Sequence, residues 1–385
     1  MQGIALALTA GFVVAYLART WRFPAIPFYI IIGIVLGATG LNVIHESETA
    51  AYLGHIGLLF LLFTMGLHLR PHDVLARRRS FVRAGSVDFG VNFAIGLIAA
   101  FLLGLPLFEA VVIAAAFYIS SSAMALSSLI ENRKLGFPES ETVVWMMVFE
   151  DIVLVLFIVL LAATQESPLS IIIMTIQFVA ASFLLVYFLK DPLRRLLSRD
   201  DEVPLLFVVA AVILAAYLSN LAGVPDSLTV IALGSAFSMV SHEAPAAIAR
   251  PFREVFMVLF FVFFGVSVQF TGALSPLLLL GLGVLAISSK LFSGIIIGRL
   301  SHRSTLSGVE IWSDTAARGE FSIALAALYG SVMVSSTVAA LVVITGVVGG
   351  FTGMYSPRIR SFLKKGKGTL QRTKHSTPAI QFKKP

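Results

Sequence analysis

The chain has 385 residues, of which 58% are hydrophobic and only 13% are charged. Soluble domains carry roughly 25% charged residues, so this composition indicates a polytopic membrane protein and gives no sign of a separate soluble domain. The formal net charge of +7 does not indicate a nucleic-acid partner, because the basic residues lie in short breaks between apolar runs. The chain has no cysteine, which excludes disulfides and thiol chemistry.

Apolar runs of bilayer length, separated by short polar breaks, predict thirteen transmembrane helices. The expected helices span residues 3–19, 25–42, 51–68, 81–104, 108–131, 139–164, 168–190, 203–222, 226–241, 252–271, 274–299, 306–329 and 332–356. The first run lacks a basic segment before it and a clear cleavage site, so we interpret it as a membrane helix and not a signal peptide. The expected fold class is therefore an all-α polytopic membrane protein.

The positions of Lys and Arg predict the orientation, because cytoplasmic loops carry an excess of these residues. All but two of the 28 basic residues lie in alternate breaks, within three residues of such a break, or in the segment after Tyr355. We therefore expect a multi-pass protein of the cell (inner) membrane with its N-terminus outside and its C-terminus in the cytoplasm. We interpret the basic tail as a disordered segment along the anionic inner leaflet. A linker to a regulatory domain, or a docking site for one, is the alternative.

Two parts of the chain share a spacing pattern. Pro27 and Gly66 are separated by 39 positions, and Pro225 and Gly265 by 40, with similar apolar residues before each glycine. This match predicts that helices one to six repeat as helices eight to thirteen. The single connecting helix would invert the second copy relative to the first, a layout found in many transporters.

Extending the same alignment pairs the polar patch Ser120–Ser122 with Arg318–Glu320. Each repeat then contributes one helix that is broken by polar residues, and the two breaks are expected to cross at the bilayer midplane. Such breaks are tolerated only where they line a cavity or are buried in protein. The first repeat, the connector with its cytoplasmic loop, the second repeat and the basic tail are expected at residues 1–164, 165–202, 203–356 and 357–385.

Few charged residues lie deep inside the expected helices, away from their ends. A charge near the bilayer centre costs at least ~2.5–3.5 kcal/mol on insertion scales, so it usually faces a polar cavity or a partner and marks a pathway. Both signs occur, on helices four, six, eleven and twelve, which predicts one shared polar site. The members are Asp88, Glu150, Asp151, Lys290, Arg318 and Glu320, with Asp314 at the margin of its helix.

Glu150 and Asp151 lie near the middle of one expected helix, about 100° apart around its axis, so they cannot face the same point. We expect one of them to pair with Lys290, for which Asp88 competes. A buried Lys–carboxylate pair can exchange its charge with a proton. The other carboxylate can bind either a proton or a small cation, and such competition couples the two fluxes.

The polar patches have two interpretations each. Ser120, Ser121 and Ser122 can coordinate a cation through hydroxyl and carbonyl oxygens, or they can bond to the preceding turn and aid packing. Arg318 and Glu320 can neutralise the ends of half-helices, or form a structural ion pair with neighbouring helices. Monovalent cations prefer oxygen ligands, and the sequence has no cysteine or histidine cluster for a transition metal. We expect no cofactor.

Several stretches together resemble the membrane domain of the monovalent cation:proton antiporter-2 family, which includes Kef-type K⁺/H⁺ and related Na⁺/H⁺ antiporters. They are Phe149–Ile152, the serine-rich break at 120–122, Lys290 and Ala317–Ser322. The resemblance extends to about Pro357. It implies a homodimer with a dimerisation region and a mobile core, the core being formed by the broken helices five and twelve with helices six and thirteen.

The resemblance also implies roles for the two adjacent carboxylates. Asp151 matches the essential ion-binding aspartate of the family, so the monovalent cation is expected at Asp151 and Glu150 is expected to be the partner of Lys290. The family usually has Asp, Asn or Gln at the preceding position, and Glu150 departs from this pattern. The charge stoichiometry is therefore left open.

The function expected from these features is secondary antiport of K⁺ or Na⁺ against H⁺ by alternating access, with K⁺ favoured. A gated, channel-like K⁺ efflux protein is one alternative, although the sequence has no recognisable carbonyl filter motif. A Na⁺-coupled carrier of organic solutes on a related fold is another. An intramembrane enzyme is least expected, because no His-Glu-x-x-His motif occurs. A cytoplasmic nucleotide-sensing domain or subunit is a further candidate partner.

Overall fold

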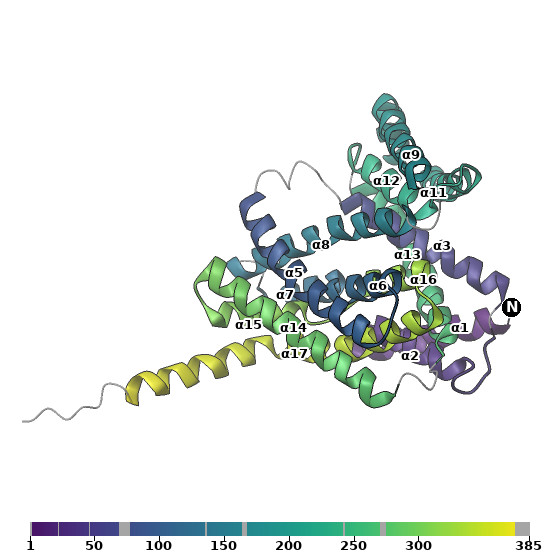
Figure 1. Cartoon of the computed structure of the whole chain (residues 1–385). Helices are drawn as coiled ribbons and strands as arrows, with labels where there is room; N and C mark the ends of the chain where they lie inside the picture. The colour runs from purple at the N-terminus through teal and green to yellow at the C-terminus, as the bar shows by residue number, and fades with distance from the viewer. Residues whose placement is uncertain are drawn as a thin grey trace, which may run out of the picture.

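The computed structural model describes residues 2–21, 23–45, 47–68, 78–134, 137–163, 168–241, 243–269 and 275–373. These residues form sixteen helices, and the β-structure among them is a single isolated bridge (Figure 1). Seven helices are long and apolar enough to cross a membrane, or eight if the bent pair α9–α10 is one span. The predicted all-α membrane class is confirmed.

The first part of the chain forms seven helices. They are α1 (Gln2–Thr20), α2 (Ile26–Leu36), α3 (Glu48–His68), α5 (Arg78–Leu102), α6 (Leu107–Tyr118), α7 (Ser122–Glu131) and α8 (Pro138–Ala163). The remainder forms nine. They are α9 (Pro168–Phe188), α10 (Lys190–Leu197), α11 (Val203–Leu221), α12 (Asp226–Ser238), α13 (Glu243–Ser267), α14 (Pro276–His302), α15 (Thr305–Thr315), α16 (Glu320–Tyr329) and α17 (Val332–Thr373).

Two of the expected helices are interrupted in the middle. The run at 108–131 forms α6 and α7, and the run at 306–329 forms α15 and α16. The interruptions contact each other, since Ser120 and Arg318 form the antiparallel bridge and the Ser121 amide donates to the Ala317 carbonyl at 2.8 Å. Backbone groups that lose their helical partners at one break thus find partners at the other.

Three segments differ most from the sequence-based boundaries. α13 begins at Glu243 instead of 252 and continues through Pro251. The connector contains a second helix, α10, which is bent by 74° from α9.

The third difference concerns the tail, where α17 continues past 356 to Thr373 and extends away from the helix bundle (Figure 1). The interpretation of this part as disordered was therefore wrong. The segment is rich in Arg, Lys and Leu, which are strong helix formers. Residues 374–385, which include the last three lysines of the tail, lie outside the described residues.

Helices α2, α3, α12 and α13 form one closely packed group, in which α3 contacts both α12 and α13 and α2 contacts α13. Small residues allow each close approach. A Cβ atom added at Gly33 would lie 2.9 Å from the Cα of Gly265, and one added at Gly234 would lie 3.1 Å from the Cα of Gly66. Each crossing therefore places glycine against glycine, with no room for a side chain on either helix.

Replacing Gly265 with Val is expected to destabilise the protein, because the new side chain would collide with the Ile30 carbonyl and lie 2.9 Å from the Gly33 Cα. Overpacking of this kind costs ~1–3 kcal/mol or more. Gly281→Ala is the matched control, since nothing lies within 4 Å of a Cβ added there. Thermal unfolding in detergent should show a clearly lower midpoint for Gly265→Val alone; equal midpoints would contradict this packing.

The second group of packed helices contains both interruptions. α5 packs against α6, α8 and α14, while α14 also packs against α15 and α17. α16 contacts α6 and α17, which closes the group around the crossing. The charged residues that the sequence assigned to one shared polar site lie on members of this group, namely α5, α8, α14, α15 and α16, or in the interruption between α15 and α16.

Candidate ion-binding site

Lys290, on α14, is the centre of a buried ion cluster. Its Nζ atom lies 2.5 Å from Oδ2 of Asp88 on α5 and 2.8 Å from Oε1 of Glu150 on α8. The side chains of Lys290 and Asp88 are 0% exposed and that of Glu150 is 3% exposed. Both carboxylates that the sequence offered as partners of Lys290 therefore contact it at once, and the cluster joins three helices.

The second oxygen of Asp88 is held by neutral side chains. Its Oδ1 atom accepts hydrogen bonds from Ser293 Oγ at 2.7 Å and from Asn92 Nδ2 at 2.9 Å. Asn92 in turn accepts a bond from Ser289 Oγ at 2.7 Å. The sequence analysis did not identify these residues. Asn92 is four positions after Asp88, and Ser293 is three after Lys290, so helical spacing was the signal available.

Glu150 is bound by the first interruption as well as by Lys290. The backbone N–H of Ser120 donates to Glu150 Oε2 at 2.6 Å, and the Ser120 hydroxyl donates to Oε1 at 2.9 Å. The carboxylate thus accepts a backbone N–H that has no helical partner, because the chain leaves the helical path at this break. The Ser120 hydroxyl, which the sequence suggested as a cation ligand, is used to hold Glu150.

The next two serines lie at the start of α7. Ser121 is the N-cap of this helix, where its Oγ accepts a bond from the Met124 amide at 3.4 Å. The same hydroxyl donates to Oε2 of Glu320 at 3.2 Å, which links the two interruptions through side chains. Ser122 is the first residue of α7 and is half-buried.

Asp151 differs from its neighbour Glu150 both in its exposure and in its contacts. It is half-buried, whereas Glu150 is buried. No hydrogen bond or ion pair to the Asp151 side chain occurs within the described ranges. The charged groups that act on it are carboxylates, Glu150 and Glu320. A negatively charged, partly accessible group with no cationic partner is suited to bind either a proton or a cation.

Arg318 is fully buried and is bound by carbonyl oxygens. Its Nε donates to the Phe117 carbonyl at 2.6 Å, and its Nη2 donates to the Ala286 carbonyl at 3.1 Å. Phe117 lies at the C-terminal end of α6, where unpaired carbonyls and the helix dipole favour a cation. In the described part of the chain Arg318 makes no ion pair, so the structural-pair interpretation does not describe it.

At α16 the charge and the helix end are both reversed, since a carboxylate lies at the N-terminal end of the helix. Glu320 is the first residue of this helix, where the positive end of the dipole favours a carboxylate. Gly319 precedes it at the crossing, and a Cβ atom added there would lie 2.6 Å from the Cβ of Ser121. The crossing thus requires glycine at this position, and it places Glu320 beside Ser121.

A second buried ion pair lies apart from this cluster. Lys134 Nζ is 3.0 Å from both oxygens of Asp314, and Ser128 Oγ donates to Asp314 Oδ1 at 2.6 Å. Ser356 of α17 also bonds to the Lys134 ammonium. The contacts connect α7 with α15 and α17. The sequence analysis missed this pair, because Lys134 was assigned to a cytoplasmic break.

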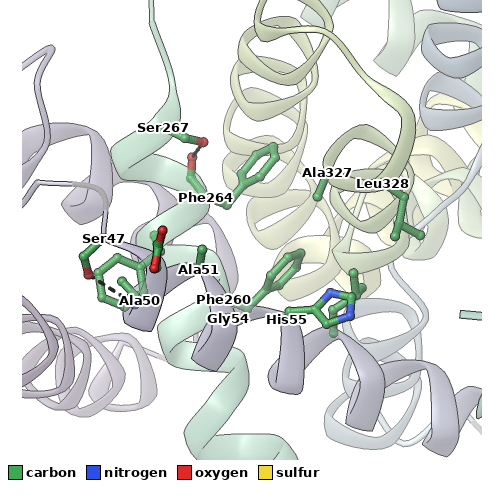
Figure 2. A pocket seen from close by; sticks show the side chains of 13 residues that line it. Ser47, Ala50, Ala51, Gly54, His55, Phe260, Phe264, Ser267, Ala327 and Leu328 are labelled. Carbon is green, nitrogen blue, oxygen red and sulfur yellow. Dashed lines mark hydrogen bonds between the residues drawn. The ribbon is translucent and has the colours of Figure 1, made fainter. Parts of the chain in front are cut away.

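A cavity of about 510 Å³ lies between α3, α13 and α16, away from both ion pairs (Figure 2). Its walls are largely apolar and include Phe260 and Phe264 of α13, with Ala327 and Leu328 of α16. His55 of α3 also lines it. Within the residues that the structure describes, no group of three His, Cys, Asp or Glu side chains is arranged to hold a metal ion.

Comparisons with known proteins bear on this arrangement. The sequence model of the family described as "Sodium/hydrogen exchanger, transmembrane" matches residues 4–355. The K⁺/H⁺ antiporter subunit KhtU of Bacillus subtilis (strain 168) is 29% identical over 384 residues, covering 94% of this chain and 94% of the relative. The ammonium/H⁺ antiporter subunit AmhT of Alkalihalophilus pseudofirmus is 24% identical over 382 residues, covering 95% and 96%.

The structure of the sodium proton antiporter MjNhaP1 from Methanocaldococcus jannaschii, determined at pH 8, is similar to the structure of this chain. The two agree with a TM-score of 0.68 at 18% sequence identity. The match covers 93% of this chain and 96% of the solved one. This likeness shows a common fold.

Proposed function

The chain belongs to the sodium/hydrogen exchanger family, and from this we propose that it exchanges K⁺ or Na⁺ for H⁺ by alternating access, with K⁺ preferred. The resemblance to monovalent cation:proton antiporters is confirmed by the family match and by the antiporter relatives. These relatives are transporters and not enzymes. Preference for K⁺ is part of the proposal, and it is supported by the similarity to KhtU, which is named as a K⁺/H⁺ antiporter subunit.

We assign the competition between proton and cation to Asp151. This single observation supports the assignment most directly: Asp151 is half-buried and unpaired within the described residues, whereas the neighbouring Glu150 is held by Lys290 and Ser120. A carboxylate whose charge is already balanced by an ammonium attracts a transported cation only weakly. The Ser121 and Ser122 region at the start of α7 is the proposed source of further oxygen ligands.

We propose that the two halves form inverted repeats, with the interruptions crossing at the midplane. The packing pairs support this arrangement, because α2 corresponds to α12 and α3 to α13 in the proposed repeat. The contact of α2 with α13 then corresponds to the contact of α12 with α3. The pair α5–α6 corresponds in the same way to α14–α15. Two-fold related contacts of this kind are expected of an inverted repeat.

Alternating access would move the group that contains the interruptions against the group formed by α2, α3, α12 and α13. The cavity in Figure 2 lies between α3 and α13 of one group and α16 of the other. The predicted orientation places it on the outer side, because the break before α3 contains no Lys or Arg. We propose that this cavity belongs to the outer access route.

We further propose that the protein works as a homodimer in the cell membrane, with its N-terminus outside. KhtU and AmhT are both named as antiporter subunits, which supports a further partner chain. A cytoplasmic nucleotide-sensing subunit or domain is our candidate, and the basic end of α17 is the segment placed to meet it.

Reconstituted protein is expected to dissipate a pH gradient across liposomes when K⁺ or Na⁺ is added, as measured with a pH-sensitive dye. K⁺ is expected to give a response at lower concentration than Na⁺, and choline should give none. Single-channel currents would instead favour the channel alternative. Uptake of a labelled organic anion driven by Na⁺, without cation-dependent proton flux, would favour the solute carrier.

A further inference from the structure

Arg253 and Glu320 lie on helices that line the cavity from the two groups of packed helices. Phe260 of α13 and Ala327 of α16 both belong to the cavity wall (Figure 2). Arg253 precedes Phe260 by seven positions, and Glu320 precedes Ala327 by seven. Residues seven apart lie on the same face of a helix and about 10 Å apart along its axis. Each charged residue therefore lies on the cavity-facing side of its helix, two turns from the cavity.

α13 and α16 run in the same direction across the membrane. A single span, α14, lies between α13 and the interrupted span formed by α15 and α16, and successive spans alternate in direction. Two turns back from the cavity therefore leads to the same depth on both helices. Arg253 and Glu320 thus lie at one level beneath the cavity, on the side opposite to the break before α3.

The two charges are opposite, and neither side chain is fully satisfied by its own neighbours. Glu320 accepts a bond from the neutral hydroxyl of Ser121 and makes no ion pair in the described part of the chain. The Nη2 atom of Arg253 donates to Glu254 at 2.7 Å, but its buried Nε atom has no hydrogen-bond partner among the described residues. The charge of Arg253 acts on the Glu320 carboxylate more strongly than that of Glu254, which opposes it. An attraction therefore crosses the space between the two groups of helices.

Glu320 is also connected to the proposed ion-binding site. Its Oε2 atom accepts the bond from Ser121, the N-cap of α7, at 3.2 Å. The charge of Glu320 also acts on Asp151. A force on Glu320 is thus transmitted to the crossing that holds the proposed cation ligands.

We infer that Arg253 is a positioning residue that attracts Glu320 across the space between the two groups, and so favours the state in which the cavity is open and the opposite side is closed. The inference rests on the proposed alternating access, and it names a contact that the motion has to weaken. Sliding of α16 along α13 changes the separation of the two charges, so their attraction stabilises one position of the group that contains the interruptions. Because 26% of the Arg253 side chain is exposed, solvent screens this attraction, and we expect a bias of about fivefold between the states.

The absence of cysteine from the chain allows a direct test with one added thiol. Ala327→Cys places this thiol in the cavity wall, on the group that moves. The whole chain, in sealed membrane vesicles of either orientation, is treated with a maleimide that does not cross the membrane. We expect labelling from the side onto which the cavity opens. Arg253→Gln in the same background is expected to lower the labelling rate by up to about fivefold.

Transport kinetics provide a second measurement. In oriented vesicles, Arg253→Gln should raise the apparent KM for K⁺ on the cavity side and lower it on the opposite side, because it shifts the population away from the open cavity. A general loss of stability would change the amount of active protein, and it would not move the two KM values in opposite directions.

Arg250→Gln is the matched control, because Arg250 is exposed and lies 3.9 Å from the same Glu254 carboxylate. It should label and transport like the parent. Arg253→Lys keeps the charge and should restore most of the labelling rate. Glu320→Gln should lower labelling as Arg253→Gln does, and combining the two substitutions should add nothing further.

Equal labelling of the parent and the Arg253→Gln variant would overturn the inference, as would an equal fall in Arg250→Gln or a parent that is labelled from neither side. If Arg253→Gln does not accumulate, Glu320→Gln decides, because unchanged labelling in that variant also contradicts the inference. Labelling needs no ion gradient, so it separates this failure from a failure of antiport. A parent without cation-dependent proton flux would overturn the proposed function, and the inference with it.

Discussion

Replacing Asp151 with Asn is expected to reduce cation-dependent proton flux to the level of empty liposomes. The amide is close in size to the carboxylate, but it neither binds a proton in this pH range nor offers a negative charge to a cation. Because Asp151 makes no hydrogen bond or ion pair in the described ranges, the substitution should leave thermal stability nearly unchanged. Dye-based flux assays and thermal unfolding in detergent measure the two effects.

Asp201→Asn is the control for this loss, because Asp201 lies in an exposed segment where it pairs with Arg199. Exposed ion pairs of this type contribute little to stability, because solvent screens the charges. The control should transport like the wild type. Cation-dependent flux that survives in Asp151→Asn would show that protons and cations compete at another group, and Glu320 would then be the first candidate.

Replacing Lys290 with Met is expected to be the most destabilising single change in the site. It leaves the buried carboxylates of Asp88 and Glu150 without their shared cation. Breaking a buried ion pair by removing one partner costs ~3–5 kcal/mol, because the remaining charge is uncompensated. The unfolding midpoint in detergent should fall clearly, or the protein should fail to accumulate in the membrane.

A variant that also carries Asp88→Asn and Glu150→Gln provides the control for this effect. With both carboxylates neutral, the change of Lys290 to Met no longer leaves a buried charge, so its additional effect on the midpoint should be much smaller. Equal effects of Lys290→Met in both backgrounds would mean that its packing, and not its charge, stabilises the protein.

Much of the fold could be predicted from the sequence because a bilayer permits only a few backbone arrangements. Long apolar runs identified the helices, and the spacing of Pro27 and Gly66 against Pro225 and Gly265 pointed to the two interrupted segments. The boundaries were less predictable where propensity and hydropathy disagree. The basic end of α17 is polar enough to lie outside the membrane, yet its residues still favour a helix.

The charged members of the site could be predicted because each is costly in a membrane and therefore conspicuous. Their pairing could not, since it depends on how α5 and α8 are rotated around α14. Sequence spacing left Asp88 and Glu150 as competitors for Lys290, and the packing allows both. Neutral ligands such as Asn92 carry no comparable signal.

The pair of Lys134 and Asp314 shows a further reason why sequence alone was insufficient. Lys134 follows α7 in a polar break, and such positions are normally solvated. A long lysine side chain can extend its ammonium along the protein to a partner well away from its own backbone. Hydropathy assigns the backbone position to a region, and it cannot report where the charge at the end of the side chain lies.

In the proposed mechanism a proton and a cation compete for Asp151. The most direct test is the apparent KM for K⁺ and for Na⁺ measured at a series of external pH values, with internal conditions fixed. Competition at a single carboxylate predicts that KM rises about tenfold for each unit of pH below the titration of that group, with an unchanged maximal rate. A KM that is independent of pH, with only the maximal rate changing, would contradict the account.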